Sequence, residues 1–125
     1  MFKWLSCLLF FAMQLNAYSS HVINAYAVSV YDKDMHEENI QGKRQTSKDY
    51  NGVVYSKIYV FGTLLQARVH VKIGNSIGSE IDQRAIVKNN LHIGNELIFK
   101  HSTVKSGYLE VSVDNKIFDQ SLYVK

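Results

Sequence analysis

The amino-acid sequence predicts an all-β fold, an immunoglobulin-like antiparallel β-sandwich of about seven strands. Several separate segments carry apolar residues at every second position, which is the period of a strand with one buried face. Glycine- and asparagine-rich turns separate most of these segments, and none shows the period of a long helix. The content of 46% hydrophobic and 20% charged residues is typical of one globular domain. A small β-barrel is the alternative architecture.

The start of the chain has the features of a secretory signal peptide. Lys3 supplies a positive charge, residues 4–13 form an apolar run, and cleavage contexts follow at Ala17 and Ser19. The apolar run is shorter than the roughly 20 residues that a transmembrane helix needs. We therefore expect residues 1–17 to be a signal peptide, cleaved after Ala17 or Ser19. The mature chain, residues 18–125, is then a single domain without a membrane span.

Cys7, the one cysteine of the chain, lies inside this leader. The mature domain therefore has no thiol for a disulfide, for nucleophilic catalysis or for metal coordination. It also lacks an N-x-Ser/Thr acceptor for glycosylation. Both absences favour a bacterial exported protein, which we expect to be periplasmic or secreted.

Seven segments fit strands, in chain order residues 22–31, 53–61, 64–73, 79–88, 91–100, 108–113 and 116–124. In the first of them, Tyr26, Val28 and Val30 are expected to face inward. Gly94-Asn95 predicts a bulge or a break in the fifth, and residues 101–106 are expected to form a loop. Residues 32–51 are the longest polar connection, with room for a helical turn over 34–41, and a connection of this length is usually functional or mobile.

The clearest alternation lies in residues 64–73. From Leu65 to Ile73 every second residue is apolar, while Arg68, His70 and Lys72 give the other face a basic character. Only Gly62-Thr63 separates this segment from the preceding strand. Because antiparallel neighbours alone can be joined so briefly, the two segments are expected to form a hairpin.

The strand over residues 53–61 carries an aromatic stripe. Val54, Ile58 and Val60 suit one face, and Tyr55, Lys57, Tyr59 and Phe61 make the other. Aromatic residues on a strand face most often belong to a core, whereas Lys57 suits a surface, so both orientations stay open. An exposed stripe beside the basic face would bind protein, because aromatic residues and arginine dominate recognition energy. The candidate protein-binding residues are therefore Tyr55, Lys57, Tyr59, Phe61, Arg68, His70 and Lys72.

The sequence argues against several other function classes. The formal net charge of +3 is modest and no nucleic-acid motif is present, so nucleic acid is not expected as a partner. There is no G-x-S-x-G motif, and the five histidines are scattered. We therefore expect no catalytic residues, no enzyme activity and no cofactor.

One acidic cluster permits a different interpretation. Asp32, Asp34, His36, Glu37 and Glu38 lie within seven residues, and carboxylates two apart in a loop can share a hard cation. The full calcium-loop pattern and the zinc motif H-E-x-x-H are both absent. The favoured interpretation is a solvated charged loop with no metal assigned, and a ligand- or metal-binding module is the alternative.

From Lys57 onward the chain resembles the CsgC-type curli chaperones, small periplasmic immunoglobulin-like proteins that keep an amyloid fibre subunit soluble. The similar features are the strand over residues 67–73, the glycine-rich turn after it, and the closing hairpin over 108–118 with Leu122-Tyr123-Val124. The C-x-C motif of that family would fall at residues 67–69, where no cysteine stands, which excludes a redox role. The resemblance implies that Arg68 and Lys72 meet a client by charge.

The sequence therefore predicts an exported, non-enzymatic β-sandwich that binds another protein, as a periplasmic assembly factor or chaperone. The partner would be an extended or acidic client strand, bound by the candidate residues or by a sheet edge. A surface or host-directed adhesion factor is a further alternative.

Overall fold

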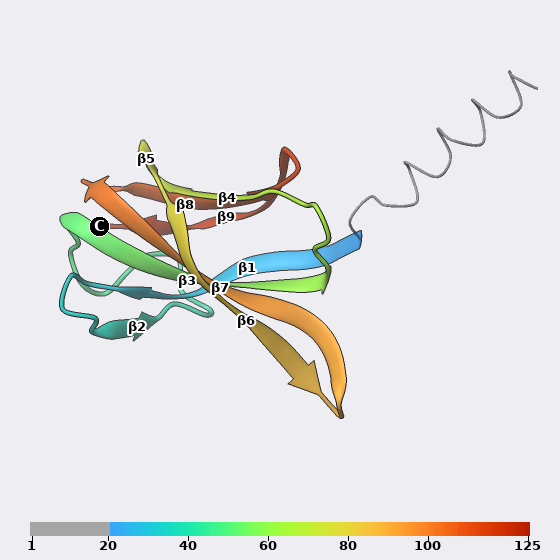
Figure 1. Ribbon diagram of the computed structural model, residues 1–125. Helices are drawn as coiled ribbons and strands as arrows, with labels where there is room; N and C mark the ends of the chain where they lie inside the picture. The colour runs from blue at the N-terminus through green and yellow to red at the C-terminus, as the bar shows by residue number, and fades with distance from the viewer. Residues whose placement is uncertain (1–20) are drawn as a thin grey trace, which may run out of the picture.

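The structure, a computed structural model, describes residues 21–125, and the predicted signal peptide lies outside this range. Two antiparallel sheets pack face to face (Figure 1). The five-stranded sheet has the order β2 (Glu37–Asn39), β1 (His21–Tyr31), β3 (Gly52–Thr63), β7 (Leu91–Val104) and β6 (Ser79–Lys88). The four-stranded sheet has the order β5 (Ser76–Ile77), β4 (Val69–Ile73), β8 (Gly107–Val113) and β9 (Lys116–Val124).

The prediction of an all-β sandwich is confirmed. Residues 21–125 contain no helix, and so none long and apolar enough to cross a membrane. The described strands number nine rather than about seven, because β2 and β5 are two short additions of three and two residues. Both lie at sheet edges, where short strands offer little backbone for unwanted pairing.

The core lies between the two sheets and follows the two-residue period of the strands. Along β3, Val54, Ser56, Ile58 and Val60 are fully buried, and the residues that alternate with them are half-buried. Leu97 of β7 adds to this side, and Val111 of β8 is among the residues that face it from the other sheet. Burying one such side chain contributes about 1.5–3 kcal/mol, so this layer is the main source of stability.

The predicted hairpin between residues 53–61 and 64–73 is wrong, because β3 and β4 belong to different sheets. The Ala67 N–H donates a 2.6 Å hydrogen bond to the Leu64 carbonyl, and Leu65 has a φ of 40°. This turn delays the start of β4 to Val69. Leu64 and Ala67 pack against the core while the chain crosses between the sheets, whereas Leu65, which begins the apolar alternation, is 61% exposed.

Of the bulge or break predicted at Gly94-Asn95, the bulge is present: β7 runs through Gly94, and its pairing with β6 shifts register beside that residue, from Ile86↔Gly94 to Val87↔His92. Two other expectations need correction. The predicted loop over residues 101–106 is wrong in its first part, since β7 continues to Val104 and pairs with β3 there. Residues 34–41 form β2 and turns rather than a helical turn.

The polar connection over residues 32–51 is anchored to the end of the chain. Thr46 N–H donates to the Tyr123 carbonyl at 2.9 Å, and Tyr123 N–H donates to the Arg44 carbonyl at 2.8 Å. Tyr50 N–H donates to the Lys125 carbonyl at 2.8 Å. The connection therefore covers the edge of β9 along its last residues.

His101 ties the two sheets together at the end of the sandwich where β5 leads into β6. Its Nε2 lies 2.9 Å from Ser56 Oγ on β3, and its Nδ1 lies 3.3 Å from the Ser76 carbonyl on β5. Since a carbonyl only accepts, Nδ1 carries the proton and Nε2 accepts from the Ser56 hydroxyl. The ring is fully buried, and this burial lowers the pKa of His101 below its ordinary value.

Stability should therefore fall as the pH drops below the ordinary histidine pKa of about 6.5. In that range the unfolded chain binds a proton that native His101 does not, so acid favours unfolding by at most about 1.4 kcal/mol per pH unit. Urea unfolding at pH 7.5 and pH 5.5 measures the effect. His101→Gln should show a smaller loss between these two pH values than the native chain, and an equal loss would contradict this role.

Candidate protein-binding surface

The stripe on β3 faces outward, away from the four-stranded sheet. Tyr55, Lys57, Tyr59 and Phe61 are each half-buried and alternate with fully buried residues. Because successive side chains point to opposite faces, all of them lie on the outer face of the five-stranded sheet. β3 lies between β1 and β7, so the stripe runs along the middle strand of that sheet.

Three rings form a cluster on this outer face. Tyr26 of β1 lies opposite Tyr59 in the register, and their ring centroids are 6.2 Å apart. The Tyr26 and Phe61 rings are 5.9 Å apart, and the Tyr59 and Phe61 rings are 6.0 Å apart in an edge-on arrangement. These spacings are in the favourable range for aromatic pairs. We call Tyr26, Tyr59 and Phe61 the aromatic cluster.

Tyr26 was expected to face inward, and this expectation is wrong. The register of β1 against β3 jumps from Ala27↔Ile58 to Ser29↔Lys57, so Val28 is an extra residue in β1. Such a bulge reverses the side on which the following residues point. Ala25 and Ala27 therefore face the core and Tyr26 faces out, while Val30 beyond the bulge is buried as expected. A count of alternate residues from Val30 back to Tyr26 misses this reversal.

A glycine opposite the cluster lets Phe61 lie close to the sheet. Gly94 of β7 pairs with Phe61, and a Cβ at Gly94 would lie 3.1 Å from Phe61 Cδ1 and 2.4 Å from the Val60 carbonyl oxygen. An aromatic ring over a glycine on a neighbouring strand covers backbone that would otherwise be exposed. The position of Phe61 therefore depends on the absence of a side chain at residue 94.

Lys57 is held by its neighbours rather than presented to a partner. Its Nζ lies 3.3 Å from Glu37 Oε2 and 3.4 Å from Glu96 Oε1. Hydrogen bonding to Tyr31, followed by attraction to Glu37, raises the pKa of Lys57. The Ser29 hydroxyl, which donates to Glu37 at 2.6 Å, in turn lowers the pKa of Glu37. The cation beside the aromatic cluster is thus neutralised within the sheet.

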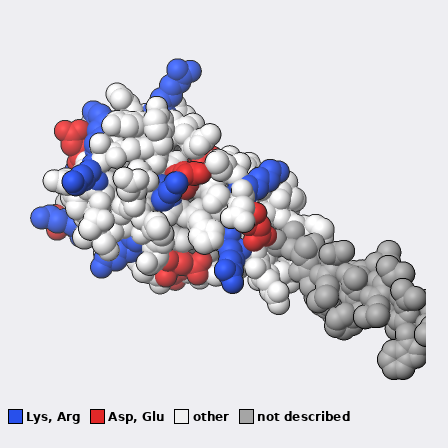
Figure 2. All heavy atoms as spheres, turned by 90° about the horizontal axis from the view of Figure 1, so that it is seen from above, with Lys and Arg blue, Asp and Glu red and all other residues white. Residues whose placement is uncertain are grey.

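Arg68, His70 and Lys72 do not join this surface. His70 and Lys72 are exposed on β4, in the other sheet, and Arg68 is exposed just before β4. Lys72 Nζ lies 3.1 Å from Glu110 Oε2, which offsets its charge. In the view from above in Figure 2, lysines and arginines are dispersed, with acidic side chains among them. The expected single surface is therefore divided between opposite outer faces of the sandwich.

The acidic loop brings together three of its five candidate ligands. Carboxylate or imidazole atoms of Asp32, Asp34 and His36 lie within 4.8 Å of one another. However, the Lys48 ammonium already contacts Asp32 Oδ2 and holds the pKa of Asp32 well below its ordinary range. Glu37 and Glu38 turn away, and Glu38 accepts from Lys43 Nζ and the Tyr50 hydroxyl instead. A metal ion at this cluster would have to displace the ammonium.

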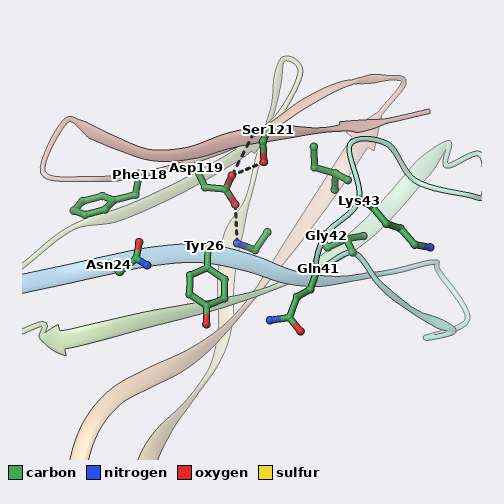
Figure 3. A pocket seen from close by; sticks show the side chains of 11 residues that line it. Asn24, Tyr26, Gln41, Gly42, Lys43, Phe118, Asp119 and Ser121 are labelled. Atoms are coloured by element: carbon green, nitrogen blue, oxygen red, sulfur yellow. Dashed lines mark hydrogen bonds between the residues drawn. The ribbon is translucent and has the colours of Figure 1, made fainter.

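A hollow of about 410 Å³ lies between the edges of β1 and β9 (Figure 3). Asp119 reaches across it, and its Oδ2 accepts the Ala27 N–H at 3.1 Å. Its Oδ1 accepts the Ser121 hydroxyl at 3.0 Å. Asp119 thus accepts a hydrogen bond from a backbone N–H in the part of β1 that β2 does not pair with, which we call the open half of β1.

One serine–histidine pair was not anticipated from the sequence. Ser56 and His101 are 45 residues apart, and only the pairing of β3 with β7 brings them together. Both side chains have no exposed surface, so a substrate in solvent cannot reach the hydroxyl. The pair therefore contributes to packing between the sheets and is not a candidate active site.

Comparisons with protein-family models, with curated proteins and with solved structures find no match for this chain.

Proposed function

We propose that this chain is an exported, non-enzymatic β-sandwich that binds another protein through the aromatic cluster. In the periplasm it would act as an assembly factor or chaperone, as the resemblance to CsgC-type proteins and their immunoglobulin-like sandwich suggests. The observation that carries the proposal is the outward position of Tyr26, Tyr59 and Phe61 on a sheet face with no covering layer in the described residues. Tyrosine supplies large contact area with a polar group at its tip, which favours recognition.

The arrangement also favours one kind of client. The resemblance implied that Arg68 and Lys72 meet a client by charge, yet Lys72 lies on β4 of the other sheet and Arg68 just before it. Beside the aromatic cluster, Lys57 is already paired with Glu37 and Glu96. The client is therefore an extended segment that presents apolar or aromatic side chains rather than carboxylates.

Two double variants distinguish client binding at the five-stranded sheet from client binding at the four-stranded sheet. Tyr26→Ala with Tyr59→Ala removes two of the three rings of the aromatic cluster, and Arg68→Ala with Lys72→Ala removes the two permanent positive charges of the basic face. We expect the first variant to bind the captured client at least about tenfold more weakly, because central interface tyrosines each contribute on the order of 2 kcal/mol. The second variant should bind as the native chain does.

The measurement begins with affinity capture of the client from extracts of the source cells, followed by titration of the purified pair. Circular dichroism and thermal melting of each variant establish that the fold is intact. Loss of binding in the basic-face variant alone would show that the client binds the four-stranded sheet instead. Unchanged binding in both variants would remove both faces from the proposal.

The second candidate is a metal-binding module at Asp32, Asp34 and His36, which the 4.8 Å cluster favours. A cation that binds only the native state raises the melting temperature. A rise with calcium, zinc or copper would support this candidate, and a flat response would dispose of it. An adhesion factor would use the same aromatic cluster, and neighbouring genes for a fibre would favour the chaperone over it.

A further inference from the structure

Most strand edges in the described part of the chain are short or covered. β2 and β5 contain three and two residues. The open half of β1 has its Ala27 N–H bonded to Asp119 and its Ala25 N–H bonded to Asn24 Oδ1. The end of β9 is bonded by residues 44–46. These are the usual ways in which a sheet avoids pairing with another chain.

β6 is different, because it is a long edge without a cover. It has ten residues, and all of them except Ile86 are exposed. Figure 1 shows β6 and the first part of β7 projecting away from the four-stranded sheet, and no other described strand pairs with the outer edge of β6. The hairpin formed by β6 and β7 exposes three large apolar side chains to solvent. Their exposed fractions are 53% at Ile81, 59% at Val87 and 67% at Leu91.

The backbone of β6 indicates which residues present hydrogen-bonding groups to a partner. The Gln83 N–H donates to the Asp82 side chain at 2.9 Å, so the Gln83 backbone faces the free edge with its N–H already occupied. By the two-residue period, Ala85 and Val87 face the same edge. The register against β7 places one extra residue, Ile81, between Glu80↔Phe99 and Asp82↔Ile98. Residues 82–88 are thus free of bulges on β6, and Ala85 is their midpoint.

The charges of this segment are self-complementary when a second copy runs antiparallel. Asp82 stands at its start, and Lys88 stands at the end. The Asp82 Oδ2 lies 3.4 Å from Arg84 Nε on the same strand, and its second oxygen lies toward the edge. A two-fold axis at Ala85 places Asp82 opposite Lys88 of the other copy, Gln83 opposite Val87, and Arg84 opposite Ile86. An axis at Arg84 would instead place two arginines face to face, which is unfavourable. The small Ala85 side chain lets the backbones approach at the axis.

We infer that two copies of this chain pair edge to edge through β6, antiparallel and centred on Ala85, so that their five-stranded sheets become one continuous sheet. The interface is isologous, as expected for a two-fold dimer. Main-chain hydrogen bonds from the N–H groups of Ala85 and Val87 and to the Gln83 carbonyl provide affinity, and the Asp82–Lys88 pairs set the register. This inference is independent of the proposed client site, which lies on the sheet face.

A cysteine placed on the two-fold axis tests the register. In a Cys7→Ser background, Ala85→Cys would bring two thiols together, since paired residues have Cα atoms about 5.5 Å apart, within disulfide range. The matched control Gln83→Cys lies on the same strand and edge, but its two copies would be on the order of 14 Å apart, or four residues along the ladder. Under mild oxidation we expect a disulfide-linked dimer from Ala85→Cys, forming at least about tenfold faster than from Gln83→Cys. Equal, slow linkage or faster linkage at residue 83 would overturn this register.

Charge exchange tests the interface without cysteine. Sedimentation equilibrium of the native chain should show a concentration-dependent dimer. Asp82→Lys and Lys88→Asp should each weaken it about tenfold, because each creates two like-charge pairs. The double variant should return to near-native affinity, while thermal melting shows each variant folded. A native chain that stays monomeric up to millimolar concentration, or a double variant no stronger than the single ones, would overturn the inference.

Discussion

Replacing Leu97 by alanine is expected to lower the free energy of unfolding by about 3 kcal/mol, because the change leaves a cavity where both sheets meet. Leu97 has no exposed surface, pairs with Ile58 of β3, and belongs to the core cluster. Urea unfolding followed by circular dichroism measures the change.

Leu91 supplies a matched control on the same strand. It is 67% exposed, so Leu91→Ala removes the same atoms without opening a cavity in the core. Its effect on the free energy of unfolding should stay within about 0.5 kcal/mol. Equal effects of the two substitutions would contradict the position of Leu97 between the sheets.

Gly94→Ala should destabilise the fold by a similar amount, about 3 kcal/mol, which is the upper part of the usual range for overpacking. The added Cβ would lie 2.4 Å from the Val60 carbonyl oxygen and 3.1 Å from Phe61 Cα. Both atoms belong to the backbone of β3, which is held between β1 and β7 and cannot withdraw. Thermal and urea unfolding provide the measurement.

Gly42→Ala is the control for Gly94→Ala, because it measures the cost of backbone strain without steric crowding. Gly42 has a φ of +78°, and no heavy atom lies within 4 Å of a Cβ built there. Its cost should therefore be that of a left-handed alanine alone, about 1 kcal/mol. If Gly94→Ala cost no more than Gly42→Ala, β3 and β7 would have to be farther apart than described.

Which features of the fold can be predicted from the sequence depends on whether they are set by neighbouring residues or by distant ones. The strand over residues 79–88 was predicted with its observed limits, and the one over 108–113 begins one residue earlier, at Gly107. Alternation shows which residues share a face of a strand. It does not show which strand lies alongside, so the brief Gly62-Thr63 connection suggested a hairpin where the chain crosses to the other sheet.

The candidate site shows the same division. Tyr55, Lys57, Tyr59 and Phe61 were correctly grouped on one face of β3, but only the packed structure shows that this face points outward. Tyr26 was missed because the extra residue Val28 reverses the alternation of β1, and a bulge of this kind has no marker in the sequence. Ser56 and His101 meet only through the pairing of β3 with β7, which the sequence did not reveal.

The anchoring of residues 44–50 to the last strand constrains the order in which the protein can fold. Tyr50 bonds to the carbonyl of Lys125, and Ala27 bonds to Asp119, which lies 92 residues further along the chain. Folds dominated by such distant contacts generally form in milliseconds to seconds, because long loops must close before the contacts contribute. The sandwich can therefore close only when residues 119–125 are available to bond residue 27 and residues 44–50.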